Sequence, residues 1–254
     1  MEAKQGTPFH YIGVSLPRSG HSFFRRALIR YFRHGLKFCD AYKPERCCQA
    51  RPCTALGGAQ VFYQKNHDFD LGLDPTMASE SLAYVVQYRH PIPQLLSYLE
   101  HSGVDPGSPA RFAWMAQHLR YRAAFVRKWL RPAPPGVLRL RYEDLVANPQ
   151  RAIGGIIRHG VGRVNERRLA AAIGATAGKI AGGDAFEPRV LEASAHFDRA
   201  SLAAYEALLL EEEPDLGYAP MFGGGTPDAA HPMVRAYRTQ ARAHAMPEQS
   251  PACE

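Results

Sequence analysis

Apolar positions form two kinds of pattern along this chain. Short, largely apolar runs, which are typical of strands, occupy residues 11–15, 60–64, 83–88 and 137–140, and Tyr84 to Val86 is continuously apolar. Between and after them lie stretches with helical periodicity, at residues 22–34, 91–101, 110–130 and 198–212. Strands that alternate with helices predict an α/β fold in which helices cover both faces of a parallel sheet.

The pattern ends before the C-terminus. From Gly223 onward, Gly, Pro, Ala and His dominate and apolar periodicity disappears, so we expect residues 223–254 to be a flexible tail. The preceding residues, 8–222, are expected to form a single domain, since 254 residues suffice for one α/β domain with a full core.

Hydropathy argues for a protein outside the membrane. The chain contains no run of about 18 uninterrupted apolar residues of the kind that spans a bilayer. Its first eight residues, Met1 to Pro8, lack the apolar core of a signal peptide. We therefore expect no membrane span and a cytoplasmic location.

The net charge favours anionic partners. Lys and Arg number 31 against 24 acidic residues, which gives a net charge of +7. Nucleic-acid binding would favour a basic stripe with interleaved aromatics or a recognisable module. The sequence shows neither, so no nucleic-acid partner is expected.

Four of the five cysteines lie in one window, as Cys39, Cys47, Cys48 and Cys53. A zinc site would prefer paired C-x-x-C units, whereas Cys47 and Cys48 are adjacent and four residues separate Cys48 from Cys53. The spacing therefore favours free thiols in a reducing compartment, with no metal.

The segment 11–22 predicts an anion site. It is a strand, a tight polar loop and a helix that starts near Ser22, which directs backbone N–H groups and the positive end of a helix dipole at one point. It is not a Walker A loop, because Ser15 stands at the first glycine position and His21 at the lysine position. Only Gly20 and Ser22 match the Walker A pattern. A cation, Arg18, lies three residues before the lysine position.

Other polar groups are expected at the same edge of the sheet. In parallel α/β sheets, ligands bind beyond the carboxyl ends of the strands. The later strands end near Lys65 and His67, at Arg89 and at Tyr142. Because Arg89 stands where a Mg²⁺-binding aspartate would be needed, phosphoryl transfer from ATP is disfavoured.

Three blocks, in this order, resemble the sulfotransferases that use 3′-phosphoadenosine 5′-phosphosulfate (PAPS). Residues 16–23, Leu-Pro-Arg-Ser-Gly-His-Ser-Phe, are similar to the family's 5′-phosphosulfate loop. The Arg-His-Pro of 89–91, with Ser97 eight residues after Arg89, is similar to the 3′-phosphate motif. The Arg-Tyr-Glu-Asp-Leu of 141–145 is similar to the segment whose tyrosine lies near the adenine. The resemblance covers residues 11–150 well.

The resemblance implies a P-loop NTPase-like sulfotransferase fold and roles for single residues. It implies His67 as general base and Arg18 and Lys65 as cations on the leaving phosphate. The acceptor would be a hydroxyl or amine of a small molecule or carbohydrate, and the product adenosine 3′,5′-bisphosphate (PAP). Residues implied in cofactor binding are Arg18, Ser19, Gly20, His21, Ser22, Phe23, Arg89, Ser97 and Tyr142.

The chain also departs from the family pattern. His21 replaces the usual Thr or Ser, and the loop that would close over the 3′-phosphate has only Lys179 and Arg189 as candidates. Asp68 is an alternative base, or a group that orients His67. A divergent P-loop small-molecule kinase and a catalytically inactive nucleotide-binding protein stay open as alternatives. The sequence identifies neither the acceptor nor the oligomeric state.

Overall fold

The chain is described from a computed structural model, which covers residues 8–41, 43, 45, 47–53, 59–131, 134–180, 191–213 and 217–245, without the side chains of 178–180 and 242–245. Its contacts divide the chain into two compact units. Unit 1 comprises Met1–His90 and Phe125–Arg189, and unit 2 comprises Pro91–Ala124 and Val190–Glu254.

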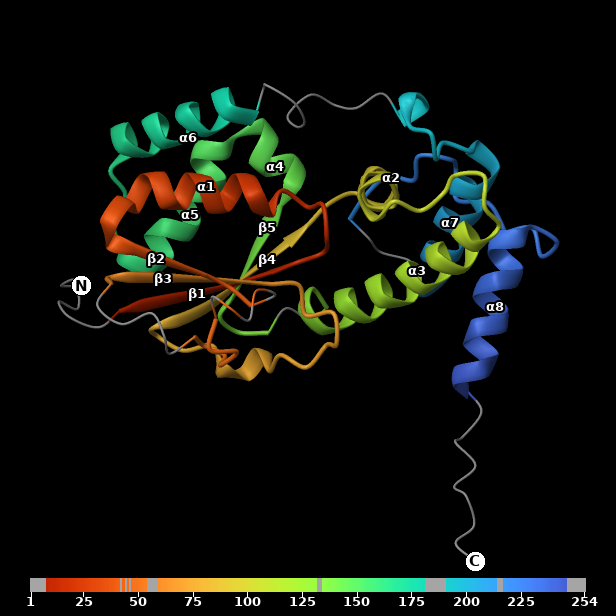
Figure 1. Cartoon of the computed structure of the whole chain (residues 1–254), viewed down its shortest axis with the longest axis horizontal. Helices are drawn as coiled ribbons and strands as arrows, with labels where there is room; N and C mark the ends of the chain where they lie inside the picture. Colours follow the sequence, from red (N-terminus) through yellow and green to blue (C-terminus); the bar gives the residue numbers. More distant parts are fainter. Residues whose placement is uncertain are drawn as a thin grey trace, which may run out of the picture. The chain divides into compact units, whose positions relative to one another are not determined.

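Unit 1 contains a five-stranded parallel sheet (Figure 1). Its strands are β1 (Phe9–Ser15), β2 (Leu36–Asp40), β3 (Val61–Asn66), β4 (Leu82–Tyr88) and β5 (Val137–Arg141). Their order in the sheet is β2-β3-β1-β4-β5, and every neighbouring pair is parallel. The four predicted strands are confirmed, whereas the edge strand β2, which lacks a continuous apolar run, was missed.

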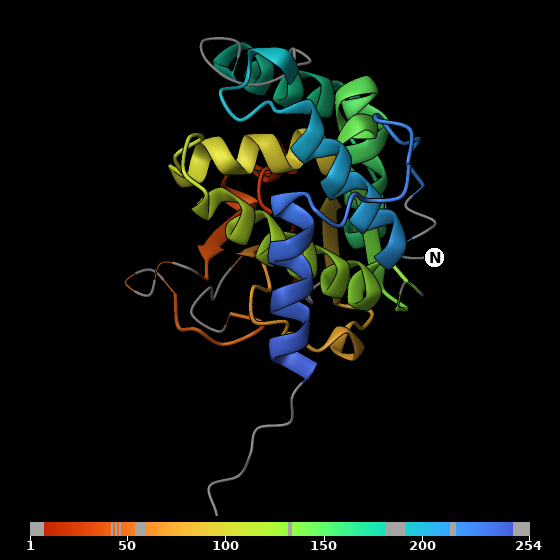
Figure 2. The same cartoon turned by 90° about the vertical axis from the view of Figure 1, so that its right-hand side faces the viewer.

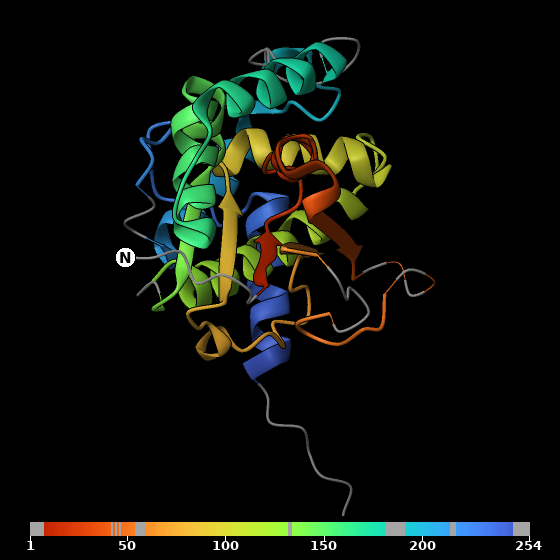
Figure 3. The ribbon, with the colours of Figure 1, turned by 90° about the vertical axis from the view of Figure 1, so that its left-hand side faces the viewer.

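Helices cover one face of this sheet (Figure 3). They are α1 (His21–Phe32) and α5 (Pro149–Val161), and α6 (Glu166–Ile180) packs against both of these helices. Alternate strand residues such as Tyr11, Tyr63 and Val85 pack against Phe24 and Ile157 and are fully buried. This is the alternation expected of side chains on a pleated sheet.

The opposite face of the sheet is also buried. Ile12, Val14 and Val86 have no exposed surface, and the ring of Tyr84 lies 4.9 Å from that of Trp129. Trp129 is the last residue of α3 (Ala110–Trp129), the C-terminal end of which belongs to this unit. An α/β fold with a parallel sheet flanked by helices is therefore confirmed.

Unit 2 is helical (Figure 2). It contains α2 (Pro91–Ser102), most of α3, α7 (Arg199–Glu212) and α8 (Pro232–Ala245). Its core is a separate apolar cluster that includes Leu95, Leu119 and Leu208. The remaining short elements of the chain are η1 (Arg33–Gly35), η3 (Pro75–Met77), α4 (Tyr142–Ala147) and η4 (Leu191–Ala193).

Helix α8 corrects the prediction of a flexible tail from residue 223. Met233, Val234 and Tyr237 of α8 are buried in the core of unit 2, and the Gln240 side chain donates a hydrogen bond to the carbonyl of Ala113. The prediction is wrong over 232–245, because three apolar residues at helical spacing suffice for docking where composition suggests a linker. Residues 246–254 lie outside the described part of the chain.

Among the residues that the structure describes, no helix combines the length and the apolar character needed to cross a bilayer.

Candidate functional site

The loop between β1 and α1 has the backbone geometry of an anion site. Arg18 and Gly20 both adopt positive φ, at 66° and 87°. A Cβ on Gly20 would lie 2.8 Å from the ring of Tyr142, so conformation and space both require glycine there. Helix α1 begins at His21, and its first turn contains no acidic residue. The positive end of the helix dipole therefore meets the loop without a carboxylate beside it.

The loop side chains divide by exposure. Arg18 and Ser22 are exposed. Ser19 is 1% exposed, and its Oγ has no hydrogen-bond partner among the described residues. A buried hydroxyl without a partner is costly, so Ser19 is suited to bind a ligand oxygen. Phe23 is 4% exposed and belongs to the core of unit 1, and its implied role in cofactor binding stays a prediction.

Arg89 follows β4 directly and belongs to the second of the three sequence blocks. Its side chain contacts residues of the other two blocks. One of its Nη atoms donates a hydrogen bond of 3.4 Å to the carbonyl of Arg18. Its guanidinium lies 4.2 Å from the ring centre of Tyr142, at the start of α4. The structure therefore brings together Arg18, Arg89 and Tyr142, which lie 71 and 53 residues apart in sequence.

Glu143 holds this arrangement in place, a role that sequence reasoning missed. One carboxylate oxygen accepts the backbone N–H of His90 at 3.0 Å, and the other accepts Arg141 Nε at 3.1 Å. These bonds connect the end of β4 with the junction of β5 and α4. The position of Glu143 next to Tyr142, within the third sequence block, was the feature of the sequence that could have indicated this role.

His67 follows β3 and is oriented by β1. Its Nδ1 lies 2.7 Å from the carbonyl oxygen of Ser15 and 2.9 Å from the Ser15 hydroxyl. A carbonyl oxygen can only accept, so Nδ1 carries the proton and the lone pair lies on Nε2. This is the tautomer that a general base requires, with Ser15 as a positioning group that the sequence did not single out.

Burial keeps His67 neutral at physiological pH. Desolvation, aided by the positive charge of Lys65, lowers its pKa to about 4, although the hydrogen bond to Ser15 and the charge of Asp40 oppose the shift. The imidazole is therefore uncharged at pH 7, with its lone pair on Nε2.

His21, at the position of the Walker lysine, is buried and neutral. It is 7% exposed, and its Nε2 lies 3.1 Å from the Tyr63 hydroxyl. Burial, followed by the neighbouring His67, Lys65 and Arg25, holds its pKa well below the usual value. Because it stays uncharged, it cannot replace the cation of a P-loop. Tyr63 was not predicted as a neighbour, since β3 shows only an apolar pattern.

Lys65 forms an ion pair across the sheet. Its Nζ lies 3.6 Å from an Asp40 carboxylate oxygen, and the two residues are register partners on β3 and β2. The sequence could not supply this partner, because β2 was not predicted.

Asp68 is a structural anchor, which corrects its reading as a base or as the group that orients His67. The side chain is fully buried. One oxygen accepts Lys128 Nζ and Trp129 Nε1, each at 2.8 Å, and the other accepts the backbone N–H of Leu73 at 2.8 Å. With these bonds made, the carboxylate holds the segment after β3 against the end of α3.

Three predicted residues are not placed with this group. Ser97 lies on α2 of unit 2 and is 7% exposed, and its contact with a 3′-phosphate stays a prediction. The side chain of Lys179 and all of Arg189 lie outside the described part of the chain.

The fold is that of known sulfotransferases. Mouse sulfotransferase SULT7A1, solved in complex with PAP, matches with a TM-score of 0.51 and 13% sequence identity, over 70% of this chain and 67% of that chain. No family model and no curated protein sequence matches the chain. A likeness at this identity shows the fold alone, and the chain has the sulfotransferase fold.

Proposed function

We propose that this protein transfers a sulfuryl group from PAPS to a hydroxyl or amine of a small-molecule or carbohydrate acceptor. The observation that carries the proposal is the contact of Arg89 with both the Arg18 carbonyl and the Tyr142 ring. It joins the three sequence blocks that resemble PAPS-binding motifs. The PAP-bound neighbour supports the same cofactor class.

The loop residues would bind the 5′-phosphosulfate. Backbone N–H groups at the start of α1, the buried Ser19 hydroxyl and exposed Ser22 supply hydrogen bonds, while Arg18 supplies charge. Arg89 would hold the 3′-phosphate, and Tyr142 would lie against the adenine. No step of this chemistry requires a metal ion.

The transfer step needs a base and a stabilised leaving group. His67 Nε2 takes the proton of the acceptor hydroxyl as the acceptor oxygen bonds to sulfur. The bond between sulfur and the bridging phosphate oxygen breaks, and PAP leaves with that electron pair. Arg18 and Lys65 stabilise the negative charge that grows on the phosphate oxygen. The anionic cofactor would also raise the pKa of His67 toward neutrality.

The kinase alternative is less consistent with the site. A P-loop kinase needs a lysine where this chain has a buried, uncharged His21, and an acidic residue where β4 ends in Arg89. A catalytically inactive nucleotide-binding protein would bind PAP without turning over PAPS.

Ligand-dependent thermal stability tests the cofactor class. A ligand that binds only the folded state, at 100 times its Kd, adds about 2.7 kcal/mol. We expect PAP to raise the melting temperature and Mg-ATP to leave it unchanged. Stabilisation by Mg-ATP alone would contradict the proposal and favour the kinase.

Turnover is tested by PAP release from PAPS in the presence of phenols, sugars and amines. Acceptor-dependent release is expected from at least one class. PAP binding without release from any class would favour the inactive alternative.

A further inference from the structure

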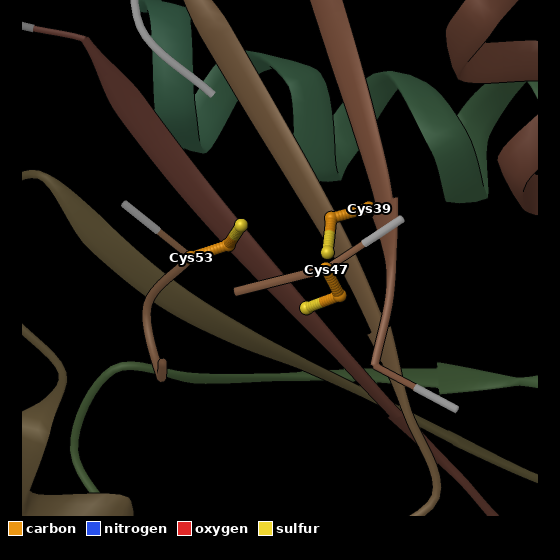
Figure 4. A group of neighbouring side chains, drawn as sticks. All are labelled: Cys39, Cys47 and Cys53. Atoms are coloured by element: carbon orange, nitrogen blue, oxygen red, sulfur yellow. The ribbon is translucent and has the colours of Figure 1, made fainter. Parts of the chain in front are cut away.

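Three cysteine sulfurs lie together beside the edge strand of the sheet. Cys39 comes from β2, and Cys47 and Cys53 come from the segment that follows it. Their Sγ atoms all lie within 4.8 Å of one another. Figure 4 shows the three side chains converging from separate points of the chain. Cys39 and Cys53 are buried, and Cys47 is half-buried.

A fourth sulfur adjoins this group. Cys48 Sγ lies 3.3 Å from Cys53 Sγ, a separation well above the roughly 2.04 Å of a disulfide bond. No disulfide joins any of these four described cysteines. A disulfide between Cys48 and Cys53 would use only two of the four sulfurs and would leave the approach of Cys39 to Cys47 unexplained.

The dimensions suit a thiolate-bound metal. Zinc–sulfur bonds of about 2.3 Å place the sulfurs of a tetrahedral site roughly 3.8 Å apart. Small rotations about the cysteine side-chain bonds would bring Sγ atoms that now lie within 4.8 Å of one another to this separation. Soft thiolates exclude Mg²⁺ and Ca²⁺ and favour Zn²⁺ among abundant divalent ions.

A bound divalent ion stabilises thiolates, so it lets several cysteine sulfurs approach one another closely.

We propose that Cys39, Cys47 and Cys53 bind one structural Zn²⁺, with Cys48 as the fourth ligand. The ion ties the segment 47–53 to β2, next to Asp40, the ion-pair partner of Lys65. The same segment is held from β3, where Gln64 Nε2 donates to the carbonyl of Ala50 at 2.9 Å. Zinc therefore braces the strand beside the candidate active site and takes no part in sulfuryl transfer.

Metal analysis of the full-length protein tests the site. We expect one zinc per chain after purification without chelator. In each of the variants Cys39→Ser, Cys47→Ser and Cys53→Ser, the zinc content per chain should fall at least tenfold. Cys253→Ser, at the fifth cysteine of the sequence, is the matched control and is expected to keep its zinc. A metal-free wild-type protein that takes up no zinc, or retention of zinc in all three variants, would overturn the proposal. Full retention in Cys48→Ser would overturn the assignment of the fourth ligand.

A measurement on the unaltered protein covers the case in which the variants fail to fold. Co²⁺ added to chelator-treated protein should give thiolate-to-cobalt charge-transfer absorption, and Zn²⁺ should abolish it. In the zinc form, mass spectrometry should find Cys39, Cys47 and Cys53 protected from alkylation, with protection lost in chelator. Absence of the charge-transfer band, or a Cys48–Cys53 disulfide in protein isolated under reducing conditions, would contradict a zinc site.

Discussion

At the scale of single residues, the candidate site depends on which atoms of its histidines carry protons. The carbonyl oxygen of Ser15 fixes His67 by accepting a hydrogen bond from Nδ1–H, so the proposed base acts through Nε2. His21, 5.9 Å away from ring centre to ring centre, is instead buried against Tyr63. The two neighbouring imidazoles therefore differ in their partners: Ser15 orients His67, the proposed base, and Tyr63 contacts His21.

Replacing His67 by Ala should abolish turnover and leave PAP binding unchanged. The imidazole would accept a proton in the transfer step but contributes no charge to cofactor binding, because it is neutral at pH 7. Acceptor-dependent PAP release and calorimetric PAP titration measure the two effects. His101→Ala, an exposed histidine on α2, is the control. Loss of PAP binding in His67→Ala would reassign His67 to structure.

Arg89→Ala should weaken PAP binding by about 2 kcal/mol or more, as expected for loss of a charge-assisted bond to phosphate. Binding of adenosine 5′-phosphosulfate, which lacks the 3′-phosphate, should change far less. Paired calorimetric titrations measure the difference, with exposed Arg151→Ala as the control. Equal weakening of both ligands would contradict the 3′-phosphate role.

At the scale of elements, close packing between neighbouring strands positions the site. Gly13 on β1 pairs with Lys65 on β3, two residues beyond Tyr63. A Cβ on Gly13 would lie 2.2 Å from the Tyr63 hydroxyl oxygen. The missing side chain is what lets Tyr63 reach His21, so a steric requirement on one strand sets the environment of the next.

Gly13→Ala should therefore destabilise the protein by about 1–3 kcal/mol, the usual cost of overpacking a core. Denaturant unfolding measures the change. Gly155→Ala, in α5 and with open space at its Cβ, is the matched control and should be neutral or stabilising by up to about 1 kcal/mol. Equal effects of the two substitutions would show that Tyr63 moves aside without cost.

Asp68→Ala should destabilise by about 3–5 kcal/mol, since it leaves Lys128 and Trp129 without their carboxylate partner. Asp70→Ala, at an exposed position two residues later, should lie within about 1 kcal/mol of wild type. Unfolding midpoints compare the two. A stable Asp68→Ala protein that has lost turnover alone would restore Asp68 as a candidate base.

At the scale of the whole molecule, each compact unit buries a histidine with a lowered pKa. Desolvation lowers the pKa of His67 in unit 1 to about 4. In unit 2, desolvation and then the charge of Arg122 lower the pKa of His118 to about 3, and its Nδ1 lies 2.9 Å from the Tyr205 hydroxyl. Both imidazoles are neutral when folded at neutral pH, so unfolding in mild acid lets them take up protons.

The free energy of unfolding should fall as pH drops from about 6.5 toward 4. The unfolded histidines titrate near 6.5 and the folded ones near 4 and 3, so the unfolded state binds more protons in this window. Each histidine removes about 2 kcal/mol between pH 7 and pH 5. Urea unfolding at the two pH values measures the loss, which His118→Gln should reduce and exposed His101→Gln should not. An unchanged loss in His118→Gln would show that His118 is protonated in the folded protein.

The sequence by itself determined the features that depend on residues close together in the chain. Short apolar runs and helical periodicity predicted four strands and four of the helices, α1, α2, α3 and α7. The loop of residues 16–23 predicted an anion site, because turn residues and a helix start define its backbone locally. The rule that ligands bind beyond parallel strand ends correctly grouped Arg18, Arg89 and Tyr142.

The tertiary structure decided what depends on distant partners. From the sequence, Asp68 is a candidate base. In the structure, Lys128 and Trp129, about 60 residues later in the chain, both donate hydrogen bonds to its carboxylate. Helix α8 packs its few apolar residues, Met233, Val234 and Tyr237, into the core of unit 2, a partner that the composition after Gly223 does not reveal. The cysteine spacing argued against zinc, yet β2 carries Cys39 to the side of Cys47 and Cys53. Periodicity and turn preferences depend on residues that are neighbours in the chain, so the sequence shows them directly. Burial and long-range contacts depend on residues that come together only when the chain folds.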